Sequence, residues 1–265
     1  GSHQLIRRLV WKAKEAPRKI VFPEGDQSKV LRACRQIIDE AIAHPILLGE
    51  RDEIAAKIKD LDLGDLLDHV EIVSTREAPQ SETYVQSYFH QRQRRGMTIE
   101  VARKHMKRRN PFGMMMVKMG DADGLVSGLT MSFPETIRPA LQIIGTRPGV
   151  KRASGMYLML LKNGDVKFFA DATLNIEPDA ETLADTAVQV ADAVREFGIT
   201  PRVAMISFSN FGSAPHPQSD KMAKAAEIAA RLRPAFEIEG ELQADAALDY
   251  EHQKELFPFS RLTGP

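Results

Sequence analysis

Short apolar runs alternate with longer amphipathic stretches from Leu5 onward, a pattern typical of a mostly parallel sheet covered by helices. The run at 20–22 predicts a strand, and apolar positions at helical spacing over 28–42 predict the helix that follows it. The alternation continues with strands at 45–49, 70–73 and 123–128 and with helices at 51–59, 81–94, 98–109 and 112–119. Gly96 is expected to end one helix and Thr98 to cap the next. The fold class is therefore α/β.

A second α/β set begins near Pro134, which suits the first turn of a helix over 134–144. Two β-rich runs, 153–161 and 166–171, flank Asn163-Gly164, and this dipeptide predicts a hairpin. Helices at 180–197 and 218–232 and strands at 203–208 and 236–240 complete the series. We expect two domains, residues 4–131 and 132–265, and we interpret residues 1–3 as the remnant of an expression tag.

Charge and composition exclude several classes of protein. The 36 basic and 36 acidic residues cancel, so no overall field favours nucleic acid or an anionic membrane. No apolar run approaches the ~20 residues needed to cross a bilayer. Cys34 is the only cysteine, so no internal disulfide can form, and we expect a reducing, cytoplasmic compartment. Cys34 and the methionines at 114, 115, 116 and 119 are expected in the core.

Several sequence signatures of bound phosphate or metal are missing. The chain has no G-x-G-x-x-G and no G-x-x-x-x-G-K-[ST], so it offers neither a dinucleotide fingerprint nor a P-loop. It has no H-E-x-x-H, and its seven histidines are scattered without a pair at helical ligand spacing. We therefore expect no metal site and no cofactor within this chain.

A basic stretch over 92–109 is the most marked local feature. Glu100 is its single acid, and its cations are Arg92, Arg94, Arg95, Arg103, Lys104, Lys107, Arg108 and Arg109. Guanidinium groups match phosphate oxygens bidentately, so the stretch is a candidate site for a polyphosphate ligand. A solvated helix face explains the same pattern, and both interpretations stay open.

Two loops after predicted strands are further candidates. The first, at 127–142, begins with Ser127 and Gly128 and leads into a predicted helix, where backbone donors favour anions. Arg138 is expected in the first turn of that helix, where its charge opposes the dipole and suits ligand contact better than helix stability. The second loop, 207–214, contains Ser209 and Gly212 and is suited to an anion or carboxylate. Ordinary turns have the same composition, so this alternative also remains.

Five strings spread along the chain together resemble the phosphotransacetylase (phosphate acetyl/butyryltransferase) family. They are FPEG at 22, HPILLG at 44, DADGLVSG at 121, ETIRPALQIIGTRPGV at 135 and GELQADAAL at 240. The details are most similar to the phosphotransacetylase-type domain that forms the carboxyl-terminal half of bacterial NADP-dependent malic enzymes. FGMMMV at 112, NIEPDAETLAD at 175 and AMISFSNFGSA at 204 carry this closer match.

The resemblance implies two three-layer α/β/α domains, as in isocitrate and isopropylmalate dehydrogenases, with an interdomain cleft that receives coenzyme A. Arg92 and Arg138 match the family's cleft arginines, and Lys29 stands where a third arginine is usual. Phe211 stands where standalone enzymes have a lysine. The family continues past the equivalent of Pro265 to the serine, arginine and aspartate that carry acyl transfer. We therefore expect no catalytic residue in this chain, and we expect the segment that completes the first domain to be absent.

Three functions remain in view. The first is a regulatory domain that binds acetyl-CoA, or a related thioester, as allosteric effector. It would assemble a homo-oligomer, at least a dimer, of a malic enzyme whose upstream domain holds NADP and a divalent metal, Mg or Mn. The second is a phosphate acetyltransferase, and the third is a structural dimerisation domain. The expected acetyl-CoA or phosphate contacts are Arg92, Arg138, Lys29, Ser127, Gly128, Ser209 and Gly212.

Overall fold

The computed structural model describes residues 1–265, which divide into two compact units. The N-terminal unit is Arg7–Thr146, and the C-terminal unit combines Gly1–Ile6 with Arg147–Pro265. The division thus falls after residue 146, whereas the sequence pattern placed it after residue 131. The intervening segment belongs to the N-terminal unit because Ile143 is buried in its core and the Gln91 side chain donates to the Ile143 carbonyl at 2.9 Å.

The N-terminal unit is built on a parallel sheet of four strands in the order β3-β2-β1-β4. The strands are β1 (Arg18–Phe22), β2 (Ala43–Leu48), β3 (Glu71–Val73) and β4 (Gly124–Leu125). Side chains alternate across this sheet, as the strand period requires. Val21 and Ile46 pack into one buried cluster, whereas Phe22 and Leu47 pack into another on the opposite face. The sheet is therefore the middle of three layers.

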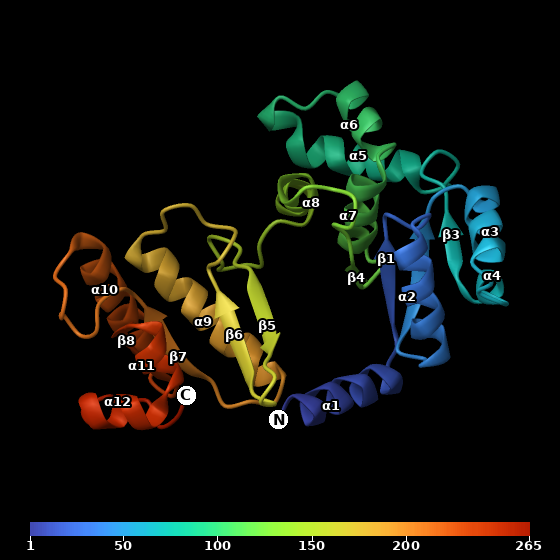
Figure 1. The fold of residues 1–265 in the computed structure, drawn as a ribbon. Helices are drawn as coiled ribbons and strands as arrows, with labels where there is room; N and C mark the ends of the chain where they lie inside the picture. Colours follow the sequence, from blue (N-terminus) through green and yellow to red (C-terminus); the bar gives the residue numbers. More distant parts are fainter. The chain divides into compact units, whose positions relative to one another are not determined.

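Helices supply the outer two layers of this unit (Figure 1). They are α2 (Ser28–Asp39), α3 (Arg51–Asp60), α4 (Leu66–His69), α5 (Ser81–Arg92), α6 (Ile99–Met106), α7 (Arg109–Met119) and α8 (Phe133–Pro139). A further helix, α1 (Ser2–Glu15), precedes β1 and has its first residues in the C-terminal unit. Helices α2 and α3 cover one face, and α5, α6 and α7 cover the other. A 3-10 turn at Gln93–Arg95 extends α5, and a π-helical turn at Ala140–Ile144 extends α8.

The helix ends test several expectations directly. Gly96 is left-handed, with φ of 80°, and ends the helical segment as predicted. Thr98 caps α6, but that helix ends at Met106 rather than near residue 109. Residues 1–3, which resemble the remnant of an expression tag, are part of the ordered fold: Ser2 begins α1, and its N–H donates to the Gly164 carbonyl at 2.6 Å.

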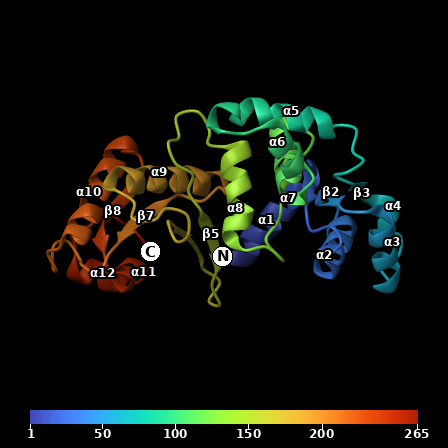
Figure 2. The same cartoon turned by 90° about the horizontal axis from the view of Figure 1, so that it is seen from above.

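The C-terminal unit combines a hairpin with a parallel strand pair (Figure 2). Its elements are β5 (Met156–Leu160), β6 (Val166–Ala170), α9 (Ala180–Glu196), β7 (Arg202–Ile206), α10 (Pro217–Leu232), β8 (Glu237–Leu242), α11 (Ala244–Leu248) and α12 (Tyr250–Leu256). The hairpin turns at Asn163-Gly164, as the dipeptide predicted. Met205 and Ile238 pack on α9 and α10, and Ala204 and Leu242 pack on α11. This parallel pair is therefore also covered on both faces, and the α/β prediction is confirmed.

Most of the predicted core residues are buried. The Cys34 side chain has no exposed surface, and burial raises the pKa of its thiol to about 12, which leaves it inert at neutral pH. Met114, Met115 and Met116 are buried in α7. Met119 is 43% exposed at the end of that helix, so its predicted place in the core is wrong.

Candidate functional site

The strand order of the N-terminal unit creates a topological switch point. Strands β2 and β4 lie on opposite sides of β1, so the connections that leave β1 and β4 diverge at the carboxyl ends of two neighbouring strands. Open α/β sheets bind ligands in the crevice beyond the strand ends at such a point. The segment after Phe22 and the segment after Leu125 therefore define the candidate site.

Glu24, in the segment after β1, is bonded to the segment after β4. Its side chain is only 6% exposed, and Oε2 accepts the backbone N–H groups of Gly128 at 2.9 Å and Leu129 at 3.0 Å. Oε1 accepts both the backbone N–H and the hydroxyl of Thr130. Burial by itself raises the pKa of Glu24, but these four bonds outweigh it and lower the pKa below the ordinary value of 4.5. The carboxylate is therefore ionised at neutral pH and fixes the loop.

This bonding changes the role expected of Gly128. Its left-handed backbone, with φ of 112°, suits glycine, but its N–H already donates to Glu24 and is not free for a ligand anion. Ser127 differs, because its Oγ is buried and has no hydrogen-bond partner. A buried hydroxyl without a partner is unfavourable, so Ser127 is the group of this loop best able to bond a ligand or a water molecule.

Two cations lie near the connection after β1. Lys29 belongs to the helix that follows this connection, and Arg109 contacts the connection from α7. Lys29 is exposed in the first turn of α2. Arg109 forms an ion pair with Asp26 at 2.9 Å. Burial raises the pKa of Asp26, but the Arg109 guanidinium outweighs this and lowers it. Arg109 is therefore held by an acid of the protein, whereas Lys29 remains available to an external anion.

Arg138 lies elsewhere in its helix than the sequence indicated. The helix begins at Phe133, so Arg138 is exposed in its last turn and not in its first. The argument from an opposed helix dipole therefore fails for this residue. The start of α8 is occupied by Glu135, whose Oε2 accepts the N–H and hydroxyl of Ser132 at 2.8 and 2.7 Å. Any ligand contact of Arg138 depends on its exposed guanidinium.

The basic stretch is divided between structural and free cations. Arg103 pairs with Glu82 at 3.1 Å, and Arg109 pairs with Asp26. Arg94, Arg95, Lys104 and Lys107 are exposed, as a solvated helix face requires. Part of the stretch therefore matches the solvated alternative, and the remaining question concerns Arg92 and Arg108.

The charges of Arg92 and Arg108 influence the pKa values of the same two side chains, Tyr88 and His105. The Tyr88 hydroxyl lies 3.3 Å from His105 Nδ1. Burial lowers the pKa of His105, and the charges of Arg108, Lys104 and Arg92 lower it further. Three cations therefore lie close enough to His105 to disfavour its protonated form, although Arg108 also lowers the pKa of the Glu135 carboxyl. Such a position favours a bound anion.

Ser209 and Gly212 lie in the C-terminal unit, in the loop after β7. Ser209 is fully buried, and its hydroxyl donates to Glu241 Oε1 at 3.0 Å. The Gly212 N–H donates to the same oxygen at 2.5 Å. Phe211 packs edge-on against Phe257 and Phe259, with ring centroids 5.2 and 4.9 Å apart. The predicted donors of this loop are thus bonded to a carboxylate of the unit itself.

The seven predicted residues fall into separate groups. The structure places Lys29, Arg92, Ser127, Gly128 and Arg138 in the N-terminal unit and Ser209 and Gly212 in the C-terminal unit. Sequence reasoning missed Glu24 and Glu241 as the acceptors of both loops. The FPEG and GELQAD strings contain these two glutamates, but the strings alone give no sign of their distant partners. It also missed His105 as the histidine close to Arg92, Lys104 and Arg108.

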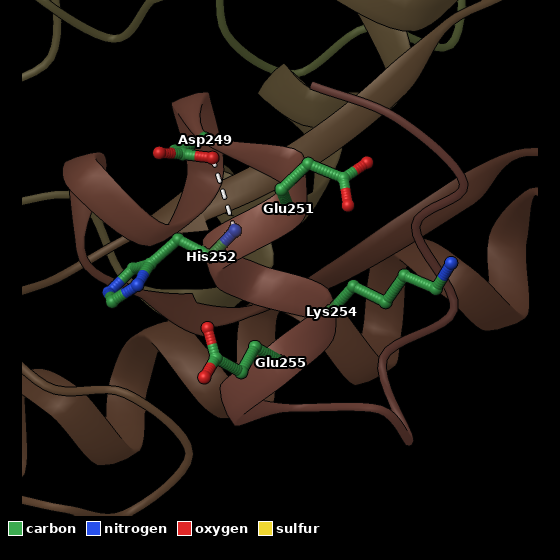
Figure 3. Close-up of a pocket in the computed structure, with 5 residues that line it drawn as sticks. All are labelled: Asp249, Glu251, His252, Lys254 and Glu255. Atoms are coloured by element: carbon green, nitrogen blue, oxygen red, sulfur yellow. Dashed lines mark hydrogen bonds between the residues drawn. The ribbon is translucent and has the colours of Figure 1, made fainter.

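A shallow surface depression on α12 contains none of these residues (Figure 3). It is lined by Asp249, Glu251, His252, Lys254 and Glu255. The dashed bond is the helix cap, in which the His252 N–H donates to Asp249 Oδ1 at 3.1 Å. The lining comes from one helix and its cap, so the depression adds no candidate chemistry.

No cluster of three or more His, Cys, Asp or Glu side chains is placed to hold a metal. None of the helices combines the length and the apolar character that a membrane span requires.

A parallel sheet with helices on both faces, and with a carboxylate-held loop at its switch point, defines an open α/β domain of the kind that binds ligands beyond its strand ends. Residues 4–265 match the family model described as "Phosphate acetyl/butaryl transferase". The chain belongs to this family, as the sequence strings predicted.

Proteins of two kinds are among the relatives. A phosphate acetyltransferase of Thermoanaerobacterium thermosaccharolyticum is 40% identical over 266 residues, which cover 98% of this chain and 80% of that protein. An NADP-dependent malic enzyme of Escherichia coli is 38% identical over 266 residues, 99% of this chain but 35% of that protein. A phosphotransacetylase structure from Streptococcus pyogenes has a TM-score of 0.91 at 39% identity and covers 100% of this chain and 80% of its own.

The chain matches only part of its relatives' length. It spans 36% of a phosphate acetyltransferase from Nitratidesulfovibrio vulgaris, to which it is 39% identical, and a similar share of the malic enzyme. The chain is therefore a phosphotransacetylase-like domain, and the same domain occurs in proteins of different overall architecture.

Proposed function

We propose that this chain binds acetyl-CoA as the phosphotransacetylase-like regulatory domain of a larger NADP-dependent malic enzyme. The observation that carries the proposal is the concentrated positive charge of Arg92 and Arg108 beside His105, in a chain that matches the family over nearly its whole length. Coenzyme A carries several phosphate groups, and arginine forks match phosphate oxygens. Lys29 and Arg138, both exposed, supply further cations, and Ser127 supplies a free hydroxyl.

Regulation requires the effector to distinguish two conformations of the enzyme. Acetyl-CoA shifts the equilibrium only by its difference in affinity for the two states, and by linkage malate or NADP then changes the affinity for acetyl-CoA to the same extent. NADP and the divalent metal, Mg or Mn, act in the catalytic domain outside this chain. We also propose that the domain assembles at least a dimer and that the protein is cytoplasmic. Light scattering measures the mass of the purified chain in solution and so tests the dimer.

A second function, phosphate acetyltransferase, is favoured by a different observation. The identity of 40% to the Thermoanaerobacterium thermosaccharolyticum enzyme covers 98% of this chain. Phe211 weighs against it, because an aromatic ring packed against Phe257 replaces the cation that the resemblance places in this loop. Neutral aromatic packing supplies no charge to hold phosphate.

Titration and turnover on the same protein separate these functions. Acetyl-CoA is titrated into the full-length protein, which includes the segment expected after Pro265, by calorimetry, and a thiol reagent then measures coenzyme A release in the presence of inorganic phosphate. Binding without release supports the regulatory domain, whereas phosphate-dependent release supports the transferase. A flat titration with folded protein contradicts both and leaves the structural dimerisation domain.

A further inference from the structure

The two units share one local arrangement that the proposed function does not explain. In each unit a buried glutamate near the end of one parallel strand accepts donors from the loop after the neighbouring strand. Glu24 follows β1 and holds the loop after β4, and Glu241 lies in β8 and holds the loop after β7. Both loops are those in which small and hydroxyl residues predicted a ligand.

The carboxylates of Glu24 and Glu241 are buried, and this burial has to be compensated by other interactions. An ionised group removed from water is costly unless hydrogen bonds replace its hydration. Glu24 receives four such bonds, three of them from consecutive backbone N–H groups, so the loop conformation and the charge depend on each other. A loop that served only to connect β4 to α8 could expose the same N–H groups to water at little cost.

The Glu24 bonds also determine which groups of the loop face a ligand. With the N–H groups of Gly128, Leu129 and Thr130 turned to Glu24, the loop presents no free backbone donor from these residues. Ser127, immediately before them, keeps a buried hydroxyl without a partner. The bonds to the three residues that follow it therefore set the place of Ser127 at the switch point.

We propose that Glu24 is a positioning residue of the acetyl-CoA site: it holds the backbone of Gly128–Thr130 and so places Ser127, the residue before them, for contact with the ligand. Glu24 touches no ligand in this account and acts only through the loop. The inference rests on the proposed function, because it assigns Glu24 to that same site. A purely structural Glu24 is the competing explanation, in which the loop stabilises the fold without affecting binding.

Three variants separate these explanations. Glu24→Gln keeps the size of the side chain but replaces one acceptor oxygen with a donor, so it breaks part of the bonding. Glu24→Asp keeps the charge on a shorter side chain and is expected to recover part of any loss. The matched control is Glu239→Gln, which removes a carboxylate that is also buried but accepts from Arg261 in the C-terminal unit.

Two measurements are made on each protein. Hydrogen exchange of the amides at 128–130 without ligand reports the loop, and calorimetric titration with acetyl-CoA reports the site. For Glu24→Gln we expect exchange and the acetyl-CoA Kd each to rise by about tenfold or more, with smaller rises for Glu24→Asp and none for Glu239→Gln. Thr130→Val removes one donor to Glu24 and serves as the test if Glu24→Gln does not fold. It is expected to raise both the exchange rate and the acetyl-CoA Kd by about threefold.

Each other outcome contradicts a stated claim. Faster exchange with an unchanged acetyl-CoA Kd shows that Glu24 is structural and overturns its positioning role. Unchanged exchange at 128–130 in Glu24→Gln shows that Glu24 does not hold the loop, and this result also overturns the positioning role. A wild-type chain that shows normal amide protection but binds no acetyl-CoA overturns the proposed function, and the positioning role with it, while the bonding of Glu24 to the loop is upheld.

Discussion

The carboxylate of Glu24 accepts the backbone N–H of Gly128 at 2.9 Å and so joins two connections that lie 104 positions apart in the sequence. These connections leave neighbouring parallel strands at the switch point of the N-terminal sheet. Together with the bonds from Leu129 and Thr130, the bond from Gly128 uses the backbone N–H groups that would otherwise be free to bind an anion. The proposed anionic ligand of this unit would therefore be recognised through side chains, above all through its exposed cations.

Acid is expected to remove the contribution of Glu24 to stability. The folded pKa of Glu24 is lowered, so its contribution is fully present above the unfolded value and is lost as pH falls through the folded pKa, which lies below 4.5. At about pH 7, Glu24→Gln is expected to lower the free energy of unfolding by about 2 kcal/mol, typical of hydrogen bonds to a charged group. Urea denaturation at several pH values measures this difference. A difference that persists undiminished well below the folded pKa contradicts the assignment.

Gly25, beside Glu24, is expected to tolerate no side chain. A Cβ at this position would lie 2.8 Å from the Leu48 carbonyl oxygen and 2.9 Å from the Leu48 nitrogen, and backbone atoms cannot move aside cheaply. Gly25→Ala is therefore expected to destabilise the protein by about 3 kcal/mol, as overpacking does. Gly124→Ala is the control in the same sheet, since its Cβ would meet only the end of the Ile20 side chain at 3.2 Å. Equal denaturation midpoints for the two variants would show the close approach to be unimportant.

The titration of His105 reports the charge around it. Burial lowers its pKa, and Arg108 is the largest of the neighbouring charges that lower it further. Removing a nearby positive charge favours the protonated ring, so Arg108→Gln is expected to raise the pKa of His105. Proton NMR of the imidazole signal against pH measures the change. Arg76→Gln, at an exposed position outside the basic stretch, is the control, and equal shifts in both variants argue against concentrated charge at His105.

Much of the fold could be predicted because local patterns determine it. Alternation of buried side chains in β1 and β2, the left-handed Gly96 and the Asn163-Gly164 turn follow from backbone geometry and strand periodicity. The short helices α4, α11 and α12 were not predicted, because four to seven residues give too little periodicity to recognise. The boundary after Thr146 was missed because the packing of Ile143 is a tertiary contact.

The candidate site could be predicted only in part. Lys29, which the family resemblance supplied, and Arg92, which the charge pattern and the resemblance supplied, stay predictions. The acceptors Glu24 and Glu241 were not predicted, since no local pattern pairs a glutamate with an N–H group 104 or 29 positions away. The expected turn of Arg138 was wrong because α8 begins at Phe133 and ends at Pro139. Charge spacing also failed to show that Arg103 and Arg109 are paired with acids, which only tertiary structure brings to them.

Calorimetric titration of the chain with acetyl-CoA, repeated with Arg138→Ala, tests the central claim most directly. We predict saturable binding to the wild-type chain and a rise in Kd of about tenfold in the variant, the loss expected for one charged hydrogen bond. Arg76→Ala removes an exposed arginine outside the basic stretch and is expected to leave the Kd unchanged. A flat titration with folded wild-type protein, or equal affinity in wild-type and Arg138→Ala proteins, would contradict this account of the site.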